Sequence, residues 1–170
     1  MYKLAVFSFL FLLISCDDGD LQIETIDFDN SALQYCGTAT ILTTVYFKIN
    51  QDETLILNLQ SGIIKNEVSD GVVVSSVPGQ SQITYRIFSD NVTTNYFCDA
   101  IPPITPVVLQ EIKGEGGEVQ VTTTTKDNIT YTHEIKLKDI SLVDDSGRRI
   151  TDLRINDFGT FTTIIPGGGL

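Results

Sequence analysis

The chain is poor in the residues on which most charge-based and metal-based chemistry depends. Its 170 residues contain 11 lysines and arginines against 22 aspartates and glutamates, one histidine, three cysteines and no tryptophan. A net charge of −11 and an isoelectric point near 4.3 argue against nucleic-acid binding, because phosphates would be repelled. Metal binding would need more histidine and cysteine ligands than the chain has. We therefore expect no nucleic acid, metal ion or cofactor.

The motifs of several enzyme classes are missing too. The sequence has no Gly-x-Ser-x-Gly elbow, no Walker glycine loop and no His-Glu-x-x-His motif. Asp145-Ser146-Gly147 matches the aspartic-protease triplet, but it occurs once, and those enzymes need two carboxylates that share a proton. A polar turn explains it. We therefore predict a protein that is not an enzyme; the alternative is a glycoside hydrolase, since two strands can bring two acids together.

One long hydrophobic run is present, and it lies at the N-terminus. After Lys3, residues 4–14 read LAVFSFLFLLI. Eleven residues span about 16 Å as a helix, which is about half of a hydrocarbon core. One lysine, a short apolar run and a small residue before the break are typical of an export signal. We expect residues 1–15 to be a signal peptide.

The end of this run carries a family resemblance. Leu13-Ile14-Ser15-Cys16 resembles the lipobox of bacterial lipoproteins, in which an aliphatic and a small residue precede a cysteine. The resemblance implies that signal peptidase II cuts before Cys16 and that the Cys16 sulfur carries a diacylglyceride. Two or three acyl chains give practically permanent attachment to a membrane. The mature protein is then a domain held on the membrane by lipid.

An acidic stretch follows Cys16. Residues 16–29 contain six acids and no base: Asp17, Asp18, Asp20, Glu24, Asp27 and Asp29. We predict a solvated, lipidated tether over residues 16–34. An acidic stretch directly after the lipidated cysteine also resembles the surface-export signal of Bacteroidota lipoproteins. That resemblance implies an outer-membrane protein on the cell surface, with the periplasmic face as the alternative.

The rest of the sequence has the composition and pattern of β-strands. Isoleucine, valine and threonine make up about a third of residues 16–170, a composition that suits pleated sheets. Gly114–Gly117 and residues 50–53 are predicted to be turns, and residues 101–106 a crossover within one domain. Two late strands are expected around residues 144–147 and 156–157. Two-residue alternation or short apolar runs predict the other strands at residues 41–49, 55–59, 72–77, 83–87, 107–112, 119–125 and 131–137.

Strands at this spacing predict an antiparallel architecture. We expect an all-β domain over residues 35–165, an immunoglobulin-like or related sandwich, with a jelly roll or partly open barrel as the alternative. Residues 166–170 are expected to form a flexible tail. His133 falls on the apolar side of its strand and is predicted to be packed rather than catalytic.

The two cysteines left after Cys16 suggest a disulfide. Outside the cytoplasm, an even remainder predicts that Cys36 pairs with Cys98. Pairing would bring Tyr35 and Tyr96 into one patch. Because sugars stack on exposed aromatic rings, these tyrosines are candidate ligand-binding residues; the alternative is that both pack over the disulfide.

A lipid anchor and an all-β domain without recognisable catalytic groups predict a surface-exposed interaction or structural module. The alternatives are a glycan-binding accessory of an outer-membrane uptake complex and a periplasm-facing assembly factor. Expected partners are the membrane, through the anchor, and outer-membrane proteins or glycans. The domain is similar in general character to the small β-rich lipoproteins of flavobacteria, a likeness that carries no functional motif.

Overall fold

The structure is a computed structural model. It describes residues 26–144, 146–147, 149–150 and 156–165. The predicted signal peptide, Cys16, the first part of the predicted tether and the tail at residues 166–170 lie outside the described residues. In the described part of the chain, no helix has the length and apolar character needed to cross a membrane.

The described residues form eight strands and one short helix. The elements are β1 (Val45–Asn50), β2 (Glu53–Asn58), β3 (Val73–Ser76), β4 (Gln82–Phe88), α1 (Asn95–Cys98), β5 (Val108–Thr125), β6 (Thr130–Val143), β7 (Arg149–Ile150) and β8 (Asp157–Ile164).

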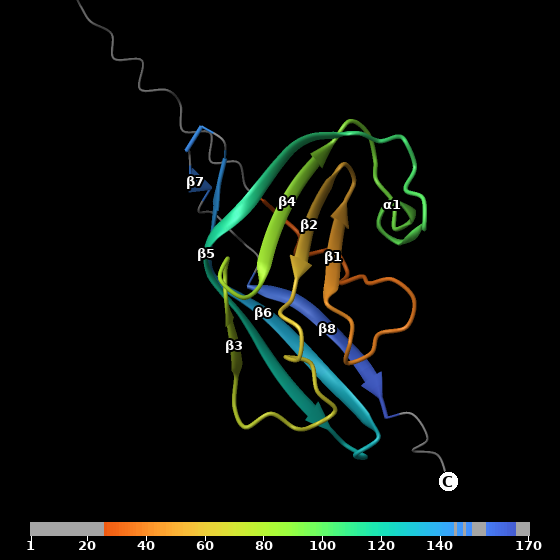
Figure 1. The fold of residues 1–170 in the computed structure, drawn as a ribbon, viewed down its shortest axis with the longest axis vertical. Coiled ribbons are helices and arrows are strands. Elements are labelled where there is room, and N and C mark those ends of the chain that lie inside the picture. Colours follow the sequence, from red (N-terminus) through yellow and green to blue (C-terminus); the bar gives the residue numbers. More distant parts are fainter. Residues whose placement is uncertain (1–25, 145, 148, 151–155, 166–170) are drawn as a thin grey trace, which may run out of the picture.

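All eight strands belong to one antiparallel sheet, which curls into a half-barrel (Figure 1). Its main path runs β1-β2-β4-β5-β6-β7. The first part of β5 pairs with β4, and residues 118–121 of the same strand pair with β3. Similarly, β6 pairs with β8 over residues 130–136 and with β7 over residues 142–143. The sheet therefore changes neighbours partway along its two longest strands.

The predicted turn at Gly114–Gly117 is wrong, because β5 continues through these residues as one strand. Its register against β6 shifts twice between Gly114 and Glu118. Gly117 has a φ of 103°, and a Cβ there would lie 2.6 Å from the carbonyl oxygen of Asp139. Glycine at this point lets the two strands bend and approach each other closely, as at a β-bulge.

The prediction of an all-β antiparallel fold is confirmed, and the single curled sheet is consistent with both a sandwich and a partly open barrel. The strand expected from Ile41 begins at Val45 instead, and Leu42 is 80% exposed in the preceding loop. A two-residue pattern continued into this loop by coincidence. Residues 40–43 form a turn instead, in which the Thr43 amide donates to the Thr40 carbonyl at 3.0 Å.

The core lies inside the curl and closes where β8 approaches β1. The rings of Phe161 in β8 and Tyr46 in β1 are 4.8 Å apart. Ile26 and Phe28, which the sequence assigned to the tether, are buried in this core. Gln34 pairs with the main chain of Phe47 in β1, with hydrogen bonds of 2.8 and 2.9 Å. Residues 26–34 therefore pack as part of the folded domain.

Candidate functional site

A disulfide joins the N-terminal loop to α1. Cys36 and Cys98 are bonded, with their Cα atoms 5.3 Å apart, so the predicted pairing is confirmed. The helix is only one turn long, and its Phe97 ring stacks on Phe47 of β1 at 4.4 Å. The Thr94 hydroxyl, at the start of the helix, donates a hydrogen bond of 2.6 Å to Gln34. These contacts fix α1, and with it the start of the segment that follows.

Tyr35 and Tyr96 lie beside the disulfide, but their rings pack against different neighbours. The Tyr35 ring lies 6.3 Å from that of Tyr46 and 6.0 Å from that of Phe161. The Tyr96 ring lies 4.9 Å from that of Phe88 in β4 and also contacts Phe97. Both tyrosines are half-buried. The two rings therefore pack on separate sets of aromatic neighbours, each tyrosine lying one or two residues from a bonded cysteine.

Directly after α1, the chain exposes an apolar segment, which comprises residues 100–109. Ile101 is 87% exposed, Ile104 is 92% exposed and Leu109 is 66% exposed. None of these ten residues is charged, and three of them are prolines. Residues 100–106 form no main-chain hydrogen bond with another described residue. Exposed apolar side chains gathered in one uncharged segment are typical of interaction surfaces.

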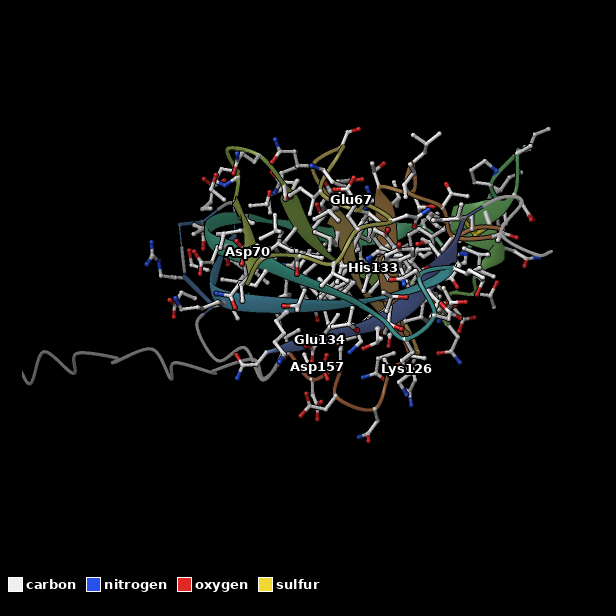
Figure 2. The ribbon with its side chains drawn as sticks, turned by 90° about the horizontal axis from the view of Figure 1, so that it is seen from below. Glu67, Asp70, Lys126, His133, Glu134 and Asp157 are labelled. Atoms are coloured by element: carbon white, nitrogen blue, oxygen red, sulfur yellow. A yellow bond between two sulfur atoms is a disulfide. The ribbon has the colours of Figure 1, made fainter. Side chains whose placement is uncertain are left out.

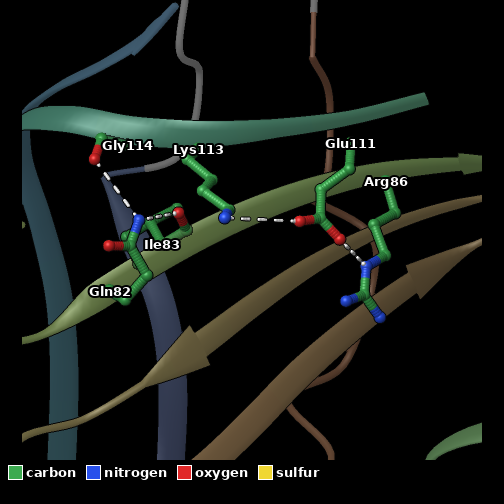
Figure 3. A network of polar contacts seen from close by, with 6 residues as sticks. All are labelled: Gln82, Ile83, Arg86, Glu111, Lys113 and Gly114. Atoms are coloured by element: carbon green, nitrogen blue, oxygen red, sulfur yellow. Dashed lines mark hydrogen bonds and ion pairs between the residues drawn. The ribbon is translucent and has the colours of Figure 1, made fainter.

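The basic groups nearest the apolar segment in sequence are engaged by one carboxylate, as Figure 3 shows. Arg86 Nε in β4 donates to Glu111 Oε2 in β5 at 2.7 Å, and Lys113 Nζ lies 3.8 Å from Glu111 Oε1. On the same pair of strands, Gln82 donates from Nε2 to the carbonyl oxygens of Ile83 and Gly114 at 2.8 and 3.3 Å. These polar contacts link β4 to β5 just beyond the apolar segment.

His133 lies near the middle of the molecule, where Figure 2 labels it; it is on the apolar side of its strand, as predicted, and is fully buried. Its Nε2 is 2.8 Å from the Thr163 hydroxyl, which donates its own proton to Asn66 Oδ1 at 2.5 Å. The Thr163 oxygen must therefore accept from Nε2–H. His133 Nδ1 lies 2.9 Å from the Thr123 hydroxyl, and in the neutral ring it accepts that hydroxyl's proton.

Burial sets the proton affinity of His133. Desolvation lowers its pKa to about 4, because the charged imidazolium is disfavoured away from water. Its ring lies against that of Phe161 at 4.9 Å. Both ring nitrogens are already hydrogen-bonded within the domain. The contacts are those of a structural histidine.

A polar cavity of about 350 Å³ opens where the N-terminal loop meets the β1–β2 turn. Its walls offer one carboxylate, three amides and one hydroxyl, and two of its residues are apolar. The lining residues are Asp27, Asn30, Ser31, Ala32, Ile49, Asn50 and Gln51. Such walls provide both donors and acceptors to a neutral polar ligand.

The remaining acidic candidates form local structure. Ser146 donates to Asp144 Oδ1 from its amide and its hydroxyl, at 2.9 and 2.6 Å, and the Gly147 amide donates to the Asp144 carbonyl. This is the turn predicted at that point; Asp145 lies outside the described residues. Among the residues that the structure covers, no three His, Cys, Asp or Glu side chains gather where they could hold a metal ion.

These features define an all-β, disulfide-bonded domain that carries an exposed apolar segment and a separate polar cavity. No protein-family model matches the chain, and no curated protein or solved structure is significantly similar to it.

Sequence reasoning took residues 101–106 as a crossover and missed their exposure. The signal present in the sequence was the absence of any charge between Asp99 and Glu111. It also missed the polar cavity, because the Asp27–Ala32 side of the cavity lies in the stretch interpreted as a tether. Ile26 and Phe28, on either side of Asp27, are buried in the core, so Asp27 is held at the cavity wall.

Proposed function

We propose that the protein is a lipid-anchored outer-membrane protein whose β-domain is a non-catalytic binding module, with the apolar segment at residues 100–109 as its contact element. The observation that carries this proposal is the exposure of Ile101 and Ile104, at 87% and 92%. Leaving such side chains in water is unfavourable, and each contributes about 1.5–3 kcal/mol when it is buried against a partner.

The attachment of the segment at both ends supports this role. At its start, Cys98 is tied by the disulfide to Cys36. At its end, Val107 exchanges hydrogen bonds of 2.9 and 3.0 Å with the amide and hydroxyl of Ser89. The three prolines further restrict the backbone. A contact element held in this way loses little conformational entropy on binding, which favours affinity.

The proposed anchor places the module near a membrane. Ten residue steps separate Cys16 from Ile26, and a fully extended chain of that length spans at most about 35 Å. A lipidated Cys16 therefore keeps the domain within that distance of the bilayer. Metabolic labelling with a palmitate analogue tests the anchor: label should be incorporated by the full chain and lost in Cys16→Ala. Protease treatment of intact cells then distinguishes the cell surface from the periplasmic face.

Chemical cross-linking on intact cells tests the contact element. Cells expressing the full chain should give cross-linked partners that disappear in the double variant Ile101→Ser/Ile104→Ser. The matched control is Leu42→Ser, which removes an apolar side chain that is 80% exposed elsewhere on the domain. Both variants change exposed positions and should fold normally. Identical cross-links from the double variant and the control would refute the role given to the apolar segment.

Glycan binding is the second candidate function, and the polar cavity is the observation that favours it. Amide and carboxylate side chains there match the alternating donors and acceptors of sugar hydroxyls. A glycan array and an NMR titration with neutral monosaccharides test this function on the purified domain. Chemical-shift changes around Asn50 that are lost in Asn50→Ala, with Asn91→Ala as control, would support it. Shifts that are scattered over the surface, or none, would count against it.

A further inference from the structure

We infer that the polar cavity binds a small hydroxylated primary amine, such as an amino sugar, with its ammonium group held by the Asp27 carboxylate. This inference rests on the second candidate function, glycan binding, and specifies the chemistry of the sugar. Asp27 carries the single charge among the residues that line the cavity in the described part of the chain. It is exposed, so a ligand can reach its carboxylate.

The polar side chains around the cavity have hydrogen-bonding capacity left for a ligand. Asp27 Oδ1 accepts a main-chain amide at 2.9 Å, and no described residue donates to Asp27 Oδ2. Asn50 Nδ2 donates to the Asp27 carbonyl oxygen at 3.2 Å, which leaves Asn50 Oδ1 as an acceptor. Within the described part of the chain, the side chains of Asn30, Ser31 and Gln51 form no hydrogen bond. A ligand therefore meets free acceptors as well as free donors.

The charge around the cavity favours a cation. No lysine or arginine is among its described lining residues. The lysine nearest to it in sequence, Lys48 of β1, is buried and already donates to the main-chain oxygens of Phe28 and Asp157. An ammonium group has three donors and no acceptor, so it can use a carboxylate and an amide oxygen together. Because hydrogen bonds to charged groups are about twice as strong as neutral ones, the cavity should prefer an ammonium to a hydroxyl at Asp27.

The rest of the cavity suits hydroxyl groups. The amides of Asn30 and Gln51 and the hydroxyl of Ser31 both donate and accept, as sugar hydroxyls do. Among the described residues, the apolar walls are Ala32 and Ile49, and no aromatic side chain lines the cavity. Its volume of about 350 Å³ lies at the small end of the range of ligand pockets, about 300–1,000 Å³. A compound of monosaccharide size, with one amine and several hydroxyls, uses the carboxylate, the amides and the hydroxyl together.

Both walls of the cavity are held by the fold. On one side, Ile26 and Phe28 are buried in the core on either side of Asp27. On the other side, the Val92 amide donates to the Gln51 carbonyl oxygen at 2.9 Å. Gln51 has a φ of 57°, a conformation that glycine adopts more readily. A long polar side chain at this strained position lines the cavity, which supports a binding role, since such strain concentrates at functional sites.

An NMR titration of the full chain, purified in detergent, tests the inference with three related sugars. Glucosamine has an amine where glucose has a hydroxyl and N-acetylglucosamine has an uncharged amide, and at about pH 6 the amine is protonated. Glucosamine should shift the side-chain amide signals of Asn50 and Gln51 and bind about tenfold or more tighter than the other two sugars. Asp27→Asn should abolish this preference. Asparagine keeps the oxygen that accepts the main-chain amide but carries no charge.

A second variant separates binding from folding. Gln51→Gly removes a lining side chain and relieves the positive φ, so it should be at least as stable as wild type. It should nevertheless bind glucosamine more weakly, because one amide is lost from the cavity. Wild-type affinity in Gln51→Gly would contradict the assignment of the ligand to this cavity.

Asp70→Asn is the matched control, because it makes the same change of charge at an exposed aspartate outside the cavity. An equal loss of glucosamine binding in Asp27→Asn and Asp70→Asn would reveal a general attraction of cations to an acidic chain and would overturn the inference. Equal binding of the three sugars would also overturn it but would leave glycan binding in place. If none of the sugars binds, the inference and the glycan-binding function both fail, while the role of the apolar segment is unaffected.

Discussion

The side-chain ammonium of Lys48 donates a hydrogen bond of 3.0 Å to the main-chain oxygen of Phe28, twenty residues before it. The same Nζ donates to the carbonyl of Asp157 at 3.2 Å. Lys48 belongs to β1 and Asp157 begins β8, so one buried lysine ties the N-terminal segment to two strands. Burial lowers the pKa of Lys48, while the nearby Asp157 and Asp29 carboxylates act in the opposite direction.

Replacing this lysine should destabilise the domain. Lys48→Met keeps an apolar stem and removes the ammonium. The Phe28 carbonyl then keeps only the Ser31 amide as a donor, and the Asp157 carbonyl loses its lysine donor. We expect a loss of about 1–3 kcal/mol in the free energy of unfolding, measured by urea denaturation of the purified domain. The control is Lys136→Met, whose exposed ion pair with Glu134 should contribute less than about 1 kcal/mol. Equal effects of the two substitutions would contradict the bridging role of Lys48.

The domain should become less stable as the pH decreases, because of His133. Its pKa is about 4 in the folded protein and about 6.5 when unfolded, so the unfolded chain takes up a proton first. The contribution of the neutral histidine is therefore complete above about pH 6.5. It is lost progressively as the pH falls from 6.5 towards 4. Chemical denaturation should report a loss on the order of 2–3 kcal/mol between pH 7.5 and pH 4.5.

A variant without a titrating ring isolates this effect. His133→Gln should be less stable than wild type at pH 7.5, because two buried hydroxyls lose well-placed partners. Its stability should nevertheless depend less on pH over the same range. Two parallel pH profiles would show that other groups control the pH dependence.

The disulfide should contribute substantially to stability. Cys36 and Cys98 are 62 residues apart, and closing a loop of this length in the unfolded chain is worth about 4 kcal/mol in the chain-entropy model. The double variant Cys36→Ala/Cys98→Ala should therefore unfold at a much lower urea concentration than wild type. With a reducing agent present, wild type should unfold at nearly the same urea concentration as the double variant. Cys16→Ala, which leaves the disulfide in place, should match wild type.

The strands were predictable because their signal is local. In β2 and β4, apolar side chains recur along the strand, and both elements lie within two residues of their expected positions. Cys36 and Cys98 were likewise predictable, since counting cysteines requires no geometry. The Gly114–Gly117 stretch was misread because glycine favours a tight turn and a bulge equally well. What decides between them is Asp139, which lies on the next strand.

The N-terminal segment and the apolar segment were not predictable for the opposite reason. The acceptors of Lys48 lie 20 and 109 residues away in sequence, and no local pattern predicts such contacts. Ile26 and Phe28 alternate with acids, so composition alone assigns them to a solvated tether. For residues 100–109, the sequence shows an apolar run. Whether its side chains are exposed depends on which distant parts of the chain pack against them, and the run itself does not tell this.

Gly117 offers a direct test of the bend that curls the sheet. Alanine at this position would adopt an unfavourable φ of 103° and would place its Cβ 2.6 Å from the Asp139 carbonyl oxygen. Strand separation or a backbone shift must then relieve the overlap. We expect Gly117→Ala to lose about 3 kcal/mol or more in urea denaturation, combining backbone strain with overpacking.

Gly62→Ala separates the two contributions. Gly62 also has a positive φ, of 83°, but nothing lies within 4 Å of the added Cβ. Gly62→Ala should therefore lose only the free energy of the unfavourable backbone φ, about 1–2 kcal/mol. If Gly117→Ala costs no more than Gly62→Ala, the close approach of β5 to β6 does not determine the bend. A larger loss at Gly117 means that the curvature of the sheet depends on a residue without a side chain where the two longest strands meet.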